Sequence, residues 1–386
     1  MAEPAVRVAV IGTGMIAAVH VRAARAAGAE VLGVLGRTVD RSRKAAAALG
    51  LPTGYASLDE LLAARPDVVH VCSPNDQHHA HALAVIAAGA HVVCEKPLAV
   101  SVDEAEELAA AASAAGVVAT VPFVYRYHPV VREIRARIVD GRLGRVLGVH
   151  GSYLQDWMHD ADVSSWRVSA STGGPSRAFA DIGSHWCDLV EFVTGERFTA
   201  VSAHTDVVHE ARPAGGAPSF GADRPGGAAH LPRVTVTTED TAVATFRTGR
   251  GRLANVVVSQ VAAGRKNRLW FEVDGSVSSA VFDQEQPESA WFGTETGAEV
   301  VVRDPSRGAP DQRRLGIVPA GHPQGYPDAF AAFVADTYRA VVTGVVPEDL
   351  PTFDDGLRSA HIVDAVVRAA ATDTTTAVHE TLETVR

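Results

Sequence analysis

The sequence predicts an α/β protein in which a doubly wound parallel sheet is followed by an α/β domain with a large, mostly antiparallel, open-faced sheet. Two observations indicate this. Over residues 6–126, short apolar runs alternate with stretches of helical periodicity, which is typical of parallel strands covered on both faces. After Arg126, apolar and polar residues alternate along strands that end in Gly, Asp and Asn turns, which is typical of antiparallel strands. We therefore predict domains at 1–126 and 127–386.

The first domain is expected to contain five strands with five helices between them. The strands are predicted at 6–12, 30–36, 68–74, 91–97 and 117–123, and the helices at Ile16–Ala27, Arg41–Leu49, Leu58–Ala64, Gln77–Ala88 and Val102–Ala115. Two helices begin with a capping box, formed by Ser57 with Glu60 and by Ser101 with Glu104. These boxes predict where the two helices start.

The second domain is expected to start with a helix and to continue with strands. The predicted elements are helix Val130–Val139, strands within 144–157, 240–249, 251–261 and 269–275, and helices Pro327–Val342 and Asp354–Ala371. We expect the last helix, at 354–371, to pack back on the first domain. Residues 211–233 are rich in Gly, Pro and Ala, which predicts a mobile loop.

Composition places the chain among ordinary globular proteins. It has 386 residues, 47% of them hydrophobic, and a net charge of −10, which argues against nucleic acid as the main ligand. The three cysteines, Cys72, Cys94 and Cys187, lie in apolar stretches without the spacing of a zinc site or a disulfide framework, which favours a reducing cytoplasm. The N-terminal apolar run has an acidic lead and contains a glycine turn, so we interpret it as a strand, and no run is long enough for a bilayer.

The first strand runs into a glycine-rich turn and then a helix. The turn is the stretch GTGMIA, formed by Gly12, Thr13, Gly14, Met15, Ile16 and Ala17. This G-x-G-x-x-A pattern at the first strand–helix junction is the fingerprint of a dinucleotide-binding Rossmann domain. Gly12 allows the tight turn, Gly14 lets the pyrophosphate approach the helix N-terminus, and Ala17 lets helix and strand pack closely. Glycines often serve tight turns alone, but this setting favours dinucleotide binding.

The residues after the second strand bear on which dinucleotide binds. NAD sites of this type usually place an acid there to hold the adenine ribose, but this chain has Gly36, followed by Arg37 and Thr38. Arginine can hold a phosphate or stack on adenine. The pattern modestly favours NADP over NAD. The basic residues farther along, Arg41, Arg43 and Lys44, are explained equally well as a solvated helix face.

Polar residues follow the next two strands at the carboxyl edge, where ligands bind in such sheets. Ser73-Pro74-Asn75 follows one strand, although Asn75 and Asp76 would also serve as a helix cap. The following helix carries three histidines: His78, His79 and His81. Since no Cys or Glu stands at ligand spacing from them, we predict no metal site.

Two further pairs of ionisable residues stand out. Glu95 and Lys96 lie in the apolar run VVCEKPLAV, where ionisable groups are costly unless they are paired or functional. Asp181 and His185 are four residues apart, so a helix would place them on one face, where the carboxylate can orient the imidazole. A helix N-terminal acid and a buried structural histidine explain the second pair equally well.

Taken together, the stretches GTGMIA, SPNDQHH, EKPLA, YRYHP and DIGSHWCDL resemble the Gfo/Idh/MocA family of oxidoreductases, named for glucose–fructose oxidoreductase and inositol dehydrogenase. The resemblance covers nearly the whole chain, including Trp166-Arg167, 321–330 and 351–365, and EKP followed by D-x-x-x-H is its most specific part. The chain departs from the family pattern at Val124, where Asn is frequent, and at Gly36, where NAD-using members have an acid.

The resemblance implies an NAD(P)-dependent enzyme that transfers a hydride between the nicotinamide and a hydroxyl or carbonyl carbon of a sugar, sugar derivative or inositol. It assigns catalysis to Lys96, which would polarise the reacting oxygen, and to His185, which would transfer a proton while Asp181 orients it. The Lys96-Pro97 bond is cis in many members. The resemblance and the glycine motif together place these residues at the cofactor: Gly12, Thr13, Gly14, Met15, Ile16, Gly36, Arg37, Thr38, Ser73, Pro74, Asn75, His78, Glu95, Lys96, Arg126, Trp166 and Arg167. Candidate substrate residues are Lys96, Tyr127, Tyr153, Trp157, Asp181, His185, His322 and Tyr326.

The resemblance also implies a homodimer or homotetramer formed through the open sheet. Three alternatives stay open: an NAD-retaining glycosidase, a trans-dihydrodiol dehydrogenase-like enzyme, and a non-catalytic dinucleotide sensor. A sensor has no need for Lys96, Asp181 and His185 together, so their joint presence favours an enzyme.

Overall fold

The computed structural model describes residues 5–214 and 231–379. It divides into two compact units, one formed by Met1–Val124 with Tyr326–Ala360 and the other by Tyr125–Gly325 with His361–Arg386. The predicted division after residue 126 falls two residues beyond the first of these breaks. Most of the loop predicted at 211–233, namely residues 215–230, lies outside the described residues.

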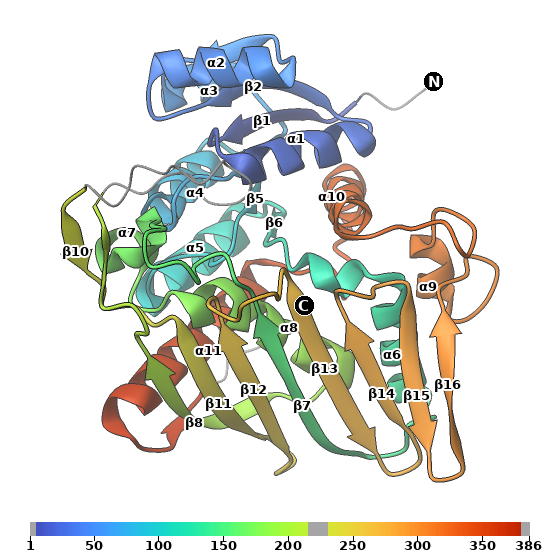
Figure 1. Cartoon of the computed structure of the whole chain (residues 1–386). Coiled ribbons are helices and arrows are strands. Elements are labelled where there is room, and N and C mark those ends of the chain that lie inside the picture. The colour runs from blue at the N-terminus through green and yellow to red at the C-terminus, as the bar shows by residue number, and fades with distance from the viewer. Residues whose placement is uncertain (1–4, 215–230, 380–386) are drawn as a thin grey trace. The chain divides into compact units, whose positions relative to one another are not determined.

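The first unit contains a six-stranded parallel sheet in the order β3-β2-β1-β4-β5-β6 (Figure 1), which confirms the doubly wound prediction. Its strands are β1 (Arg7–Ile11), β2 (Glu30–Leu35), β3 (Thr53–Tyr55), β4 (Val68–Val71), β5 (His91–Cys94) and β6 (Ala119–Thr120). Its helices are α1 (Met15–Ala26), α2 (Val39–Leu49), α3 (Leu58–Ala63), α4 (His78–Ala87), α5 (Val102–Ala115) and α10 (Tyr326–Thr343). Strand β3 was not among the predicted strands.

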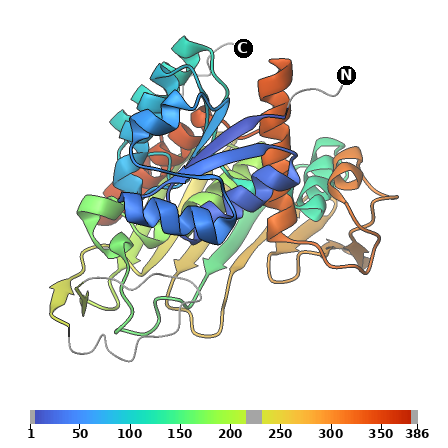
Figure 2. The ribbon, with the colours of Figure 1, turned by 90° about the horizontal axis from the view of Figure 1, so that it is seen from above.

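The two faces of this sheet are buried by different helices. Alternate strand residues such as Val69 and Val71 join an apolar core with α3, α4 and α5. Their neighbour His70 points the other way, toward α1 and α10. Helices α1 and α10 pack against each other (Figure 2), so a late segment of the chain completes the first unit.

Both predicted capping boxes form. Ser101 Oγ accepts a hydrogen bond from Glu104 N–H at 3.3 Å, and the Glu104 carboxylate accepts one from Val100 N–H at 3.3 Å. Ser57 and Glu60 make the equivalent pair at the start of α3. In each box the glutamate reaches the residue before the serine, so the chain entering the helix is fixed as well.

The second unit contains a nine-stranded sheet in the order β16-β15-β14-β13-β7-β12-β11-β8-β17. The strands are β7 (Val146–Leu154), β8 (Phe198–Asp206), β11 (Thr241–Thr248), β12 (Leu253–Ser259), β13 (Arg268–Gly275), β14 (Ser279–Asp283), β15 (Ser289–Thr294), β16 (Gly297–Val302) and β17 (Thr376–Ala377). Strands β7 and β12 pair in parallel, and the other neighbours pair antiparallel. The sheet is therefore mostly antiparallel, as predicted, with this one parallel pair.

Helices cover one face of the nine-stranded sheet and leave the other open. The further elements of the chain are α6 (Pro129–Val139), α7 (Ala170–Gly173), α8 (Ser184–Thr194), α9 (Pro310–Leu315), α11 (Phe353–Thr372) and the separate pair β9 (Ala211–Pro213) and β10 (Arg233–Thr235). Helix α8 packs on β7 and β13, and α6 packs on β14 and β15. Along β11 and β12 buried residues alternate with exposed ones, as an open face requires. No helix in the described part of the chain has the length and apolarity that crossing a bilayer requires.

Candidate active site

The glycine turn after β1 has the geometry of a dinucleotide site. Gly12 has a φ of +121°, and a Cβ there would lie 2.3 Å from the carbonyl oxygen of Cys72, so only glycine fits. Gly14 is the N-cap of α1, with no side-chain cap, and a Cβ there would meet no described atom within 4 Å. Protein packing therefore does not explain Gly14, whereas a pyrophosphate approaching the helix N-terminus does. Ala17 is fully buried against the sheet. The turn is completed by Thr13, Met15 and Ile16.

Gly36 has a packing reason of its own. A Cβ at this position would lie 2.8 Å from Thr13 Cγ2, and its N–H donates to Ser42 Oγ at 2.8 Å. A side chain there would crowd the Thr13 side chain and the first turn of α2, so the lack of an acid does not by itself report a cofactor preference. Arg37 is exposed, and Thr38 caps α2 with its side chain.

The loops after β4 and β5 are joined by one histidine. His78 Nε2 lies 2.9 Å from the carbonyl oxygen of Ser73, and its Nδ1 lies 2.8 Å from that of Pro97. Burial lowers the pKa of His78. The Lys96-Pro97 bond is cis, as the resemblance implied. His78 therefore fixes the turn that carries Lys96 to the loop at the end of the neighbouring strand.

Glu95 is buried at the end of β5 and holds both neighbouring groups. Its Oε1 is 2.9 Å from His20 Nε2, and its Oε2 accepts from the backbone N–H of Lys96 at 3.1 Å. Burial raises the pKa of Glu95, but the His20 hydrogen bond and the charges of His20, Lys96 and His78 outweigh it, so the pKa is lowered overall. The carboxyl group is held as an anion beside Lys96.

The cap explanation for Asn75 and Asp76 is wrong. Both lie inside a 3₁₀ turn, Asn75–Gln77, that follows exposed Pro74, and no side chain caps this turn or α4. Asn75 is buried. Its predicted place at the cofactor stays a prediction.

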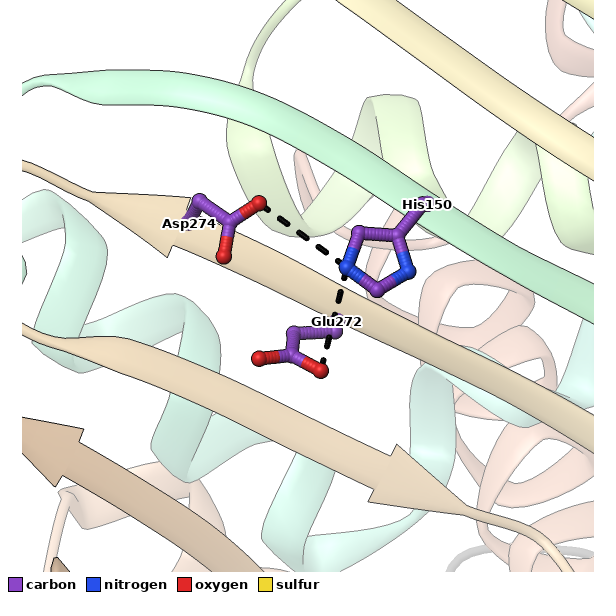
Figure 3. A group of neighbouring side chains, drawn as sticks. All are labelled: His150, Glu272 and Asp274. Carbon is purple, nitrogen blue, oxygen red and sulfur yellow. Dashed lines mark ion pairs between the residues drawn. The ribbon is translucent and has the colours of Figure 1, made fainter.

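The histidines of α4 and a group around His150 do not include the predicted catalytic residues. On α4, His79 pairs with Glu107 at 2.8 Å and His81 Nδ1 lies 3.0 Å from Ser73 Oγ. A second group, formed by His150, Glu272 and Asp274 on β7 and β13, brings its ligand atoms within 4.8 Å of one another (Figure 3). His150 Nε2 lies 3.8 Å and 3.9 Å from the two carboxylates, which makes a weak ion-pair group at the open sheet face.

In the second unit, Asp181 lies in a π-helical turn, Phe179–Gly183, that runs into α8. Gln260 Nε2 donates to Asp181 Oδ2 at 2.9 Å, and Arg167 Nε lies 3.7 Å from Oδ1. The Arg167 guanidinium stacks on Trp166. The predicted helix is present, but its first turn is a π turn, a feature frequent at functional sites.

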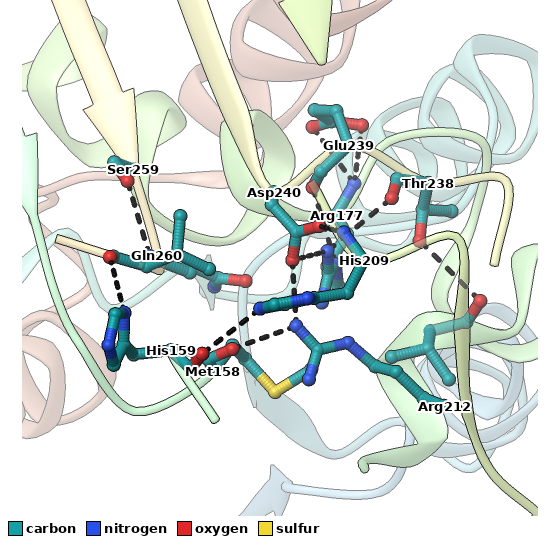
Figure 4. Close-up of polar contacts among 12 residues, drawn as sticks. Met158, His159, Arg177, His209, Arg212, Thr238, Glu239, Asp240, Ser259 and Gln260 are labelled. Atoms are coloured by element: carbon teal, nitrogen blue, oxygen red, sulfur yellow. Dashed lines mark hydrogen bonds and ion pairs between the residues drawn. The ribbon is translucent and has the colours of Figure 1, made fainter. Parts of the chain in front are cut away.

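A buried ionic cluster anchors this π turn (Figure 4). Glu239 accepts from the N–H groups of Phe179 at 2.8 Å and of Arg177 at 3.1 Å. The next residue, Asp240, pairs with the guanidinium groups of both Arg177 and Arg212, and all three side chains are fully buried. Arg212 also donates to carbonyl groups of the loop that follows β7.

His185 lies among tyrosines that sequence reasoning only partly identified. Its ring meets Tyr125 edge to face at 5.0 Å and lies 6.4 Å from Tyr153. The two tyrosine hydroxyls are 2.6 Å apart, and Asn267 bonds to both. Gln155 donates to Asn267 and accepts from the indole N–H of Trp157, a predicted substrate residue. The sequence did not identify Tyr125, Gln155 or Asn267, nor Gln260, which donates to Asp181.

Four predicted residues have other surroundings. Arg126 is buried in a bidentate pair with Asp188, and Tyr127 is buried under the guanidinium of Arg132. His322 is exposed in the second unit, and Tyr326 packs on Phe330 in the first. Their roles toward cofactor and substrate stay predictions.

Comparison with known proteins decides the family. A model described as an oxidoreductase family with an NAD-binding Rossmann fold matches residues 6–123, and one described as the GFO/IDH/MocA C-terminal domain matches residues 131–281. The chain belongs to the Gfo/Idh/MocA family. This confirms the resemblance, and the chain is an NAD(P)-dependent oxidoreductase acting on CH–OH groups.

Three relatives illustrate the family. The chain is 33% identical over 313 residues to levoglucosan dehydrogenase of Pseudarthrobacter phenanthrenivorans, covering 79% of this chain and 78% of that protein. A levoglucosan dehydrogenase solved with NADH and levoglucosan is 27% identical, with a TM-score of 0.86 over 98% of this chain and 100% of that one. An inositol dehydrogenase homolog from Azotobacter vinelandii, solved with NADH and myo-inositol, is 26% identical, with a TM-score of 0.81 over 97% of each chain.

Proposed function

We propose that this Gfo/Idh/MocA oxidoreductase oxidises a hydroxyl carbon of a sugar, sugar derivative or inositol, or reduces the corresponding carbonyl. The observation that carries the proposal is the identity with levoglucosan dehydrogenase over most of both chains. The hydrogen bonds of His78 to the Lys96 turn and of Glu239 to the π turn at Asp181 support it, because each gives a polar side chain of the site a fixed backbone.

The chain's own residues would bind, orient and manage the proton. The nicotinamide, when bound, supplies the hydride acceptor or donor. The turn at Gly14 binds the pyrophosphate. The Lys96 ammonium donates to the reacting oxygen and stabilises the negative charge that develops on it. His185 exchanges the proton with that oxygen, and Asp181, held by Gln260, orients it.

The test is a substrate screen combined with a lysine substitution. Purified protein is assayed with NAD and NADP against anhydrosugars, free sugars, glycosides and inositols, following absorbance of the reduced cofactor. Lys96→Ala is expected to slow turnover about 10²- to 10³-fold while cofactor affinity changes little. The chain has only three lysines, and Lys44, exposed in an ion pair with Asp40, provides the control Lys44→Ala. Near-normal turnover of Lys96→Ala would overturn the proposal.

We also propose that NADP binds more tightly than NAD, with both usable. Arg37 is exposed directly after Gly36, where a 2′-phosphate would lie. A charge-assisted hydrogen bond contributes about 1.5–3 kcal/mol, which is about tenfold in affinity or more. Calorimetric titration of both cofactors is expected to show this gap and its narrowing in Arg37→Ala but not in Lys44→Ala. Tighter binding of NAD would contradict the proposal.

The same reasoning extends to assembly and compartment. We propose a homodimer or homotetramer through the open sheet face, where the exposed valines Val243 and Val257 stand opposite each other on β11 and β12. Sedimentation is expected to show a smaller species for Val257→Lys but not for Val139→Lys, an exposed valine at the end of α6.

A cytoplasmic location is supported by the three buried free cysteines, Cys72, Cys94 and Cys187.

A further inference from the structure

Four buried side chains form a continuous hydrogen-bonded chain through the first unit. Glu95 Oε1 lies 2.9 Å from His20 Nε2, and His20 Nδ1 lies 2.8 Å from His70 Nδ1. His70 Nε2 lies 2.9 Å from the hydroxyl of Tyr338. Both histidines are fully buried, and the other two residues are less than a tenth exposed. We call this set the Glu95 relay.

The relay draws its members from separate elements. His20 lies on α1, one turn after the glycine motif, His70 lies in the middle of β4, and Tyr338 comes from α10. The rings of His20 and His70 meet edge to face at 5.0 Å, and His20 packs in the same way on Phe330. Packing from three elements therefore fixes both imidazole rings.

With Glu95 ionised and His20 neutral, one proton arrangement satisfies every bond of the relay. An ionised Glu95 only accepts, so His20 must carry its proton on Nε2. A neutral His20 then accepts at Nδ1 from the Nδ1–H of His70, and His70 Nε2 accepts from the Tyr338 hydroxyl. Burial lowers the pKa of His70 and raises that of Tyr338, in both cases strongly, so His70 is neutral and Tyr338 keeps its proton.

Building on the proposed role of Lys96, we propose that His20, His70 and Tyr338 are positioning residues that hold Glu95 ionised and oriented, so that its second oxygen fixes the Lys96 backbone. Without the His20 donor, burial would favour the protonated carboxylic acid. Protonation would remove the anion beside Lys96 and weaken the hydrogen bond from its N–H group. The titratable groups around Glu95 are His20, His78, Lys96, Cys72 and Cys94. The two thiols stay neutral because burial raises the pKa of each well above its usual value.

The proton arrangement is tested directly, without any turnover, by nitrogen NMR of the protein labelled in its histidine rings. The chain has 16 histidines, so the signals of His20 and His70 are assigned by their loss in His20→Gln and His70→Gln. The expected result is an Nε2–H tautomer for His20 and an Nδ1–H tautomer for His70 between pH 6 and 8. The opposite tautomer at His20, or a His20 that titrates in this range, would overturn the relay.

The positioning role is tested by the pH dependence of kcat/KM. His20→Leu keeps the side-chain volume and removes the donor, so the pKa of Glu95 rises and the acid limb of the profile is expected to move up by about one to two pH units. His20→Gln, which can still donate to Glu95, is expected to restore most of the limb. Tyr338→Phe is expected to move it by less, and Tyr55→Phe, a buried tyrosine on β3 outside the relay, not at all.

The outcomes separate this inference from the proposed function. A Lys96→Ala variant with near-normal turnover defeats the proposed function, and the tautomers still decide whether the relay exists. If Lys96→Ala abolishes turnover but His20→Leu leaves the acid limb of the kcat/KM profile in place, the positioning role of the relay is wrong and the proposed function stands. If His20→Leu does not fold, Tyr338→Phe carries the same test, because it removes one hydroxyl and keeps the ring.

Discussion

Each unit of the molecule buries a polar network next to a predicted catalytic residue, and the two networks use different chemistry. The Glu95 relay beside Lys96 contains one carboxylate, and its other members are two imidazoles and a phenol. The network under Asp181 joins Asp240 to two guanidinium groups, those of Arg177 and Arg212. Guanidinium groups do not lose their proton in proteins. The second network therefore keeps its positive charges across the accessible pH range, whereas the first responds to pH through the carboxyl group of Glu95.

Because of this difference, we expect the Asp240 cluster to affect mainly stability and the Glu95 relay to affect mainly the pH dependence of activity. A permanently charged cluster contributes to stability only while every partner is present, because a single remaining buried charge is costly. Removing one hydrogen bond from the Glu95 relay lowers the stability less, because it leaves no arginine unpaired. Its main consequence is a change in the charge of the Glu95 carboxyl group. Breaking the arginine cluster should destabilise the fold, whereas breaking the relay should change how the enzyme responds to pH.

The largest effect is expected at Asp240. Asp240→Asn leaves two buried guanidinium groups without their carboxylate, which should lower the free energy of unfolding by about 3–5 kcal/mol. Denaturant unfolding at pH 7 measures this loss. Asp373→Asn, at a side chain 85% exposed, serves as the matched control and should change stability little. A loss below about 1 kcal/mol for Asp240→Asn would show that the cluster is not a structural anchor.

A smaller effect on turnover is expected at Gln260, which connects the anchored region to Asp181. Gln260→Leu removes the hydrogen bond to the carboxylate, and such a bond contributes about 1.5–3 kcal/mol, so turnover should fall about 10- to 100-fold. Cofactor affinity should stay unchanged, because the cofactor residues of the glycine turn belong to the other unit. Gln312→Leu is the control, since Gln312 is equally buried and bonds instead to the Arg307 carbonyl. Equal losses in both variants would mean a general packing effect.

In the second unit, His128 makes the stability depend on pH. The ring is buried between Tyr125 and Phe282, its Nε2 has no hydrogen-bond partner among the described residues, and burial lowers its pKa to about 4. Because the folded pKa is below the unfolded value of about 6.5, the unfolded state binds the proton first, and stability falls as the pH drops below 6.5. Between pH 7 and pH 5 His128 should account for about 2 kcal/mol of this loss. His128→Phe should flatten the stability profile by that amount, measured by denaturant unfolding at both pH values, and an unchanged slope would contradict this origin.

The sequence predicts the parts of this molecule that depend on local patterns. Apolar periodicity identified the strands from β1 to β6 except β3, which is only three residues long and contains Gly54. The capping serines were found because their glutamates stand three residues away in the same helix. By contrast, the parallel pairing of β7 with β12 joins segments about one hundred residues apart, and no local pattern specifies it.

The candidate site shows the same limit. EKP and D-x-x-x-H were found as motifs, but the π turn at Asp181 depends on Glu239, which comes from a different part of the chain. Tyr125 was missed in favour of Tyr127 because residues two apart on a 3₁₀ turn point in different directions. His70 did leave a signal: a histidine inside the apolar strand VVHV is costly unless it is bonded.

The smallest predicted effect is that of Ser101→Ala, which tests whether the first turn of α5 helps to position Lys96. Ser101 caps that helix five residues after Lys96, so Ser101→Ala should lower the free energy of unfolding by about 1 kcal/mol. Turnover should change less than twofold, because Glu95 and His78, rather than the helix cap, hold the turn that carries Lys96. Ser57→Ala removes the equivalent cap of α3 and serves as the matched control for stability. Unfolding and turnover are measured on both variants. A tenfold fall in turnover for Ser101→Ala alone would mean that the start of α5 positions Lys96. The Glu95 relay would then share this role with a helix cap that does not respond to pH.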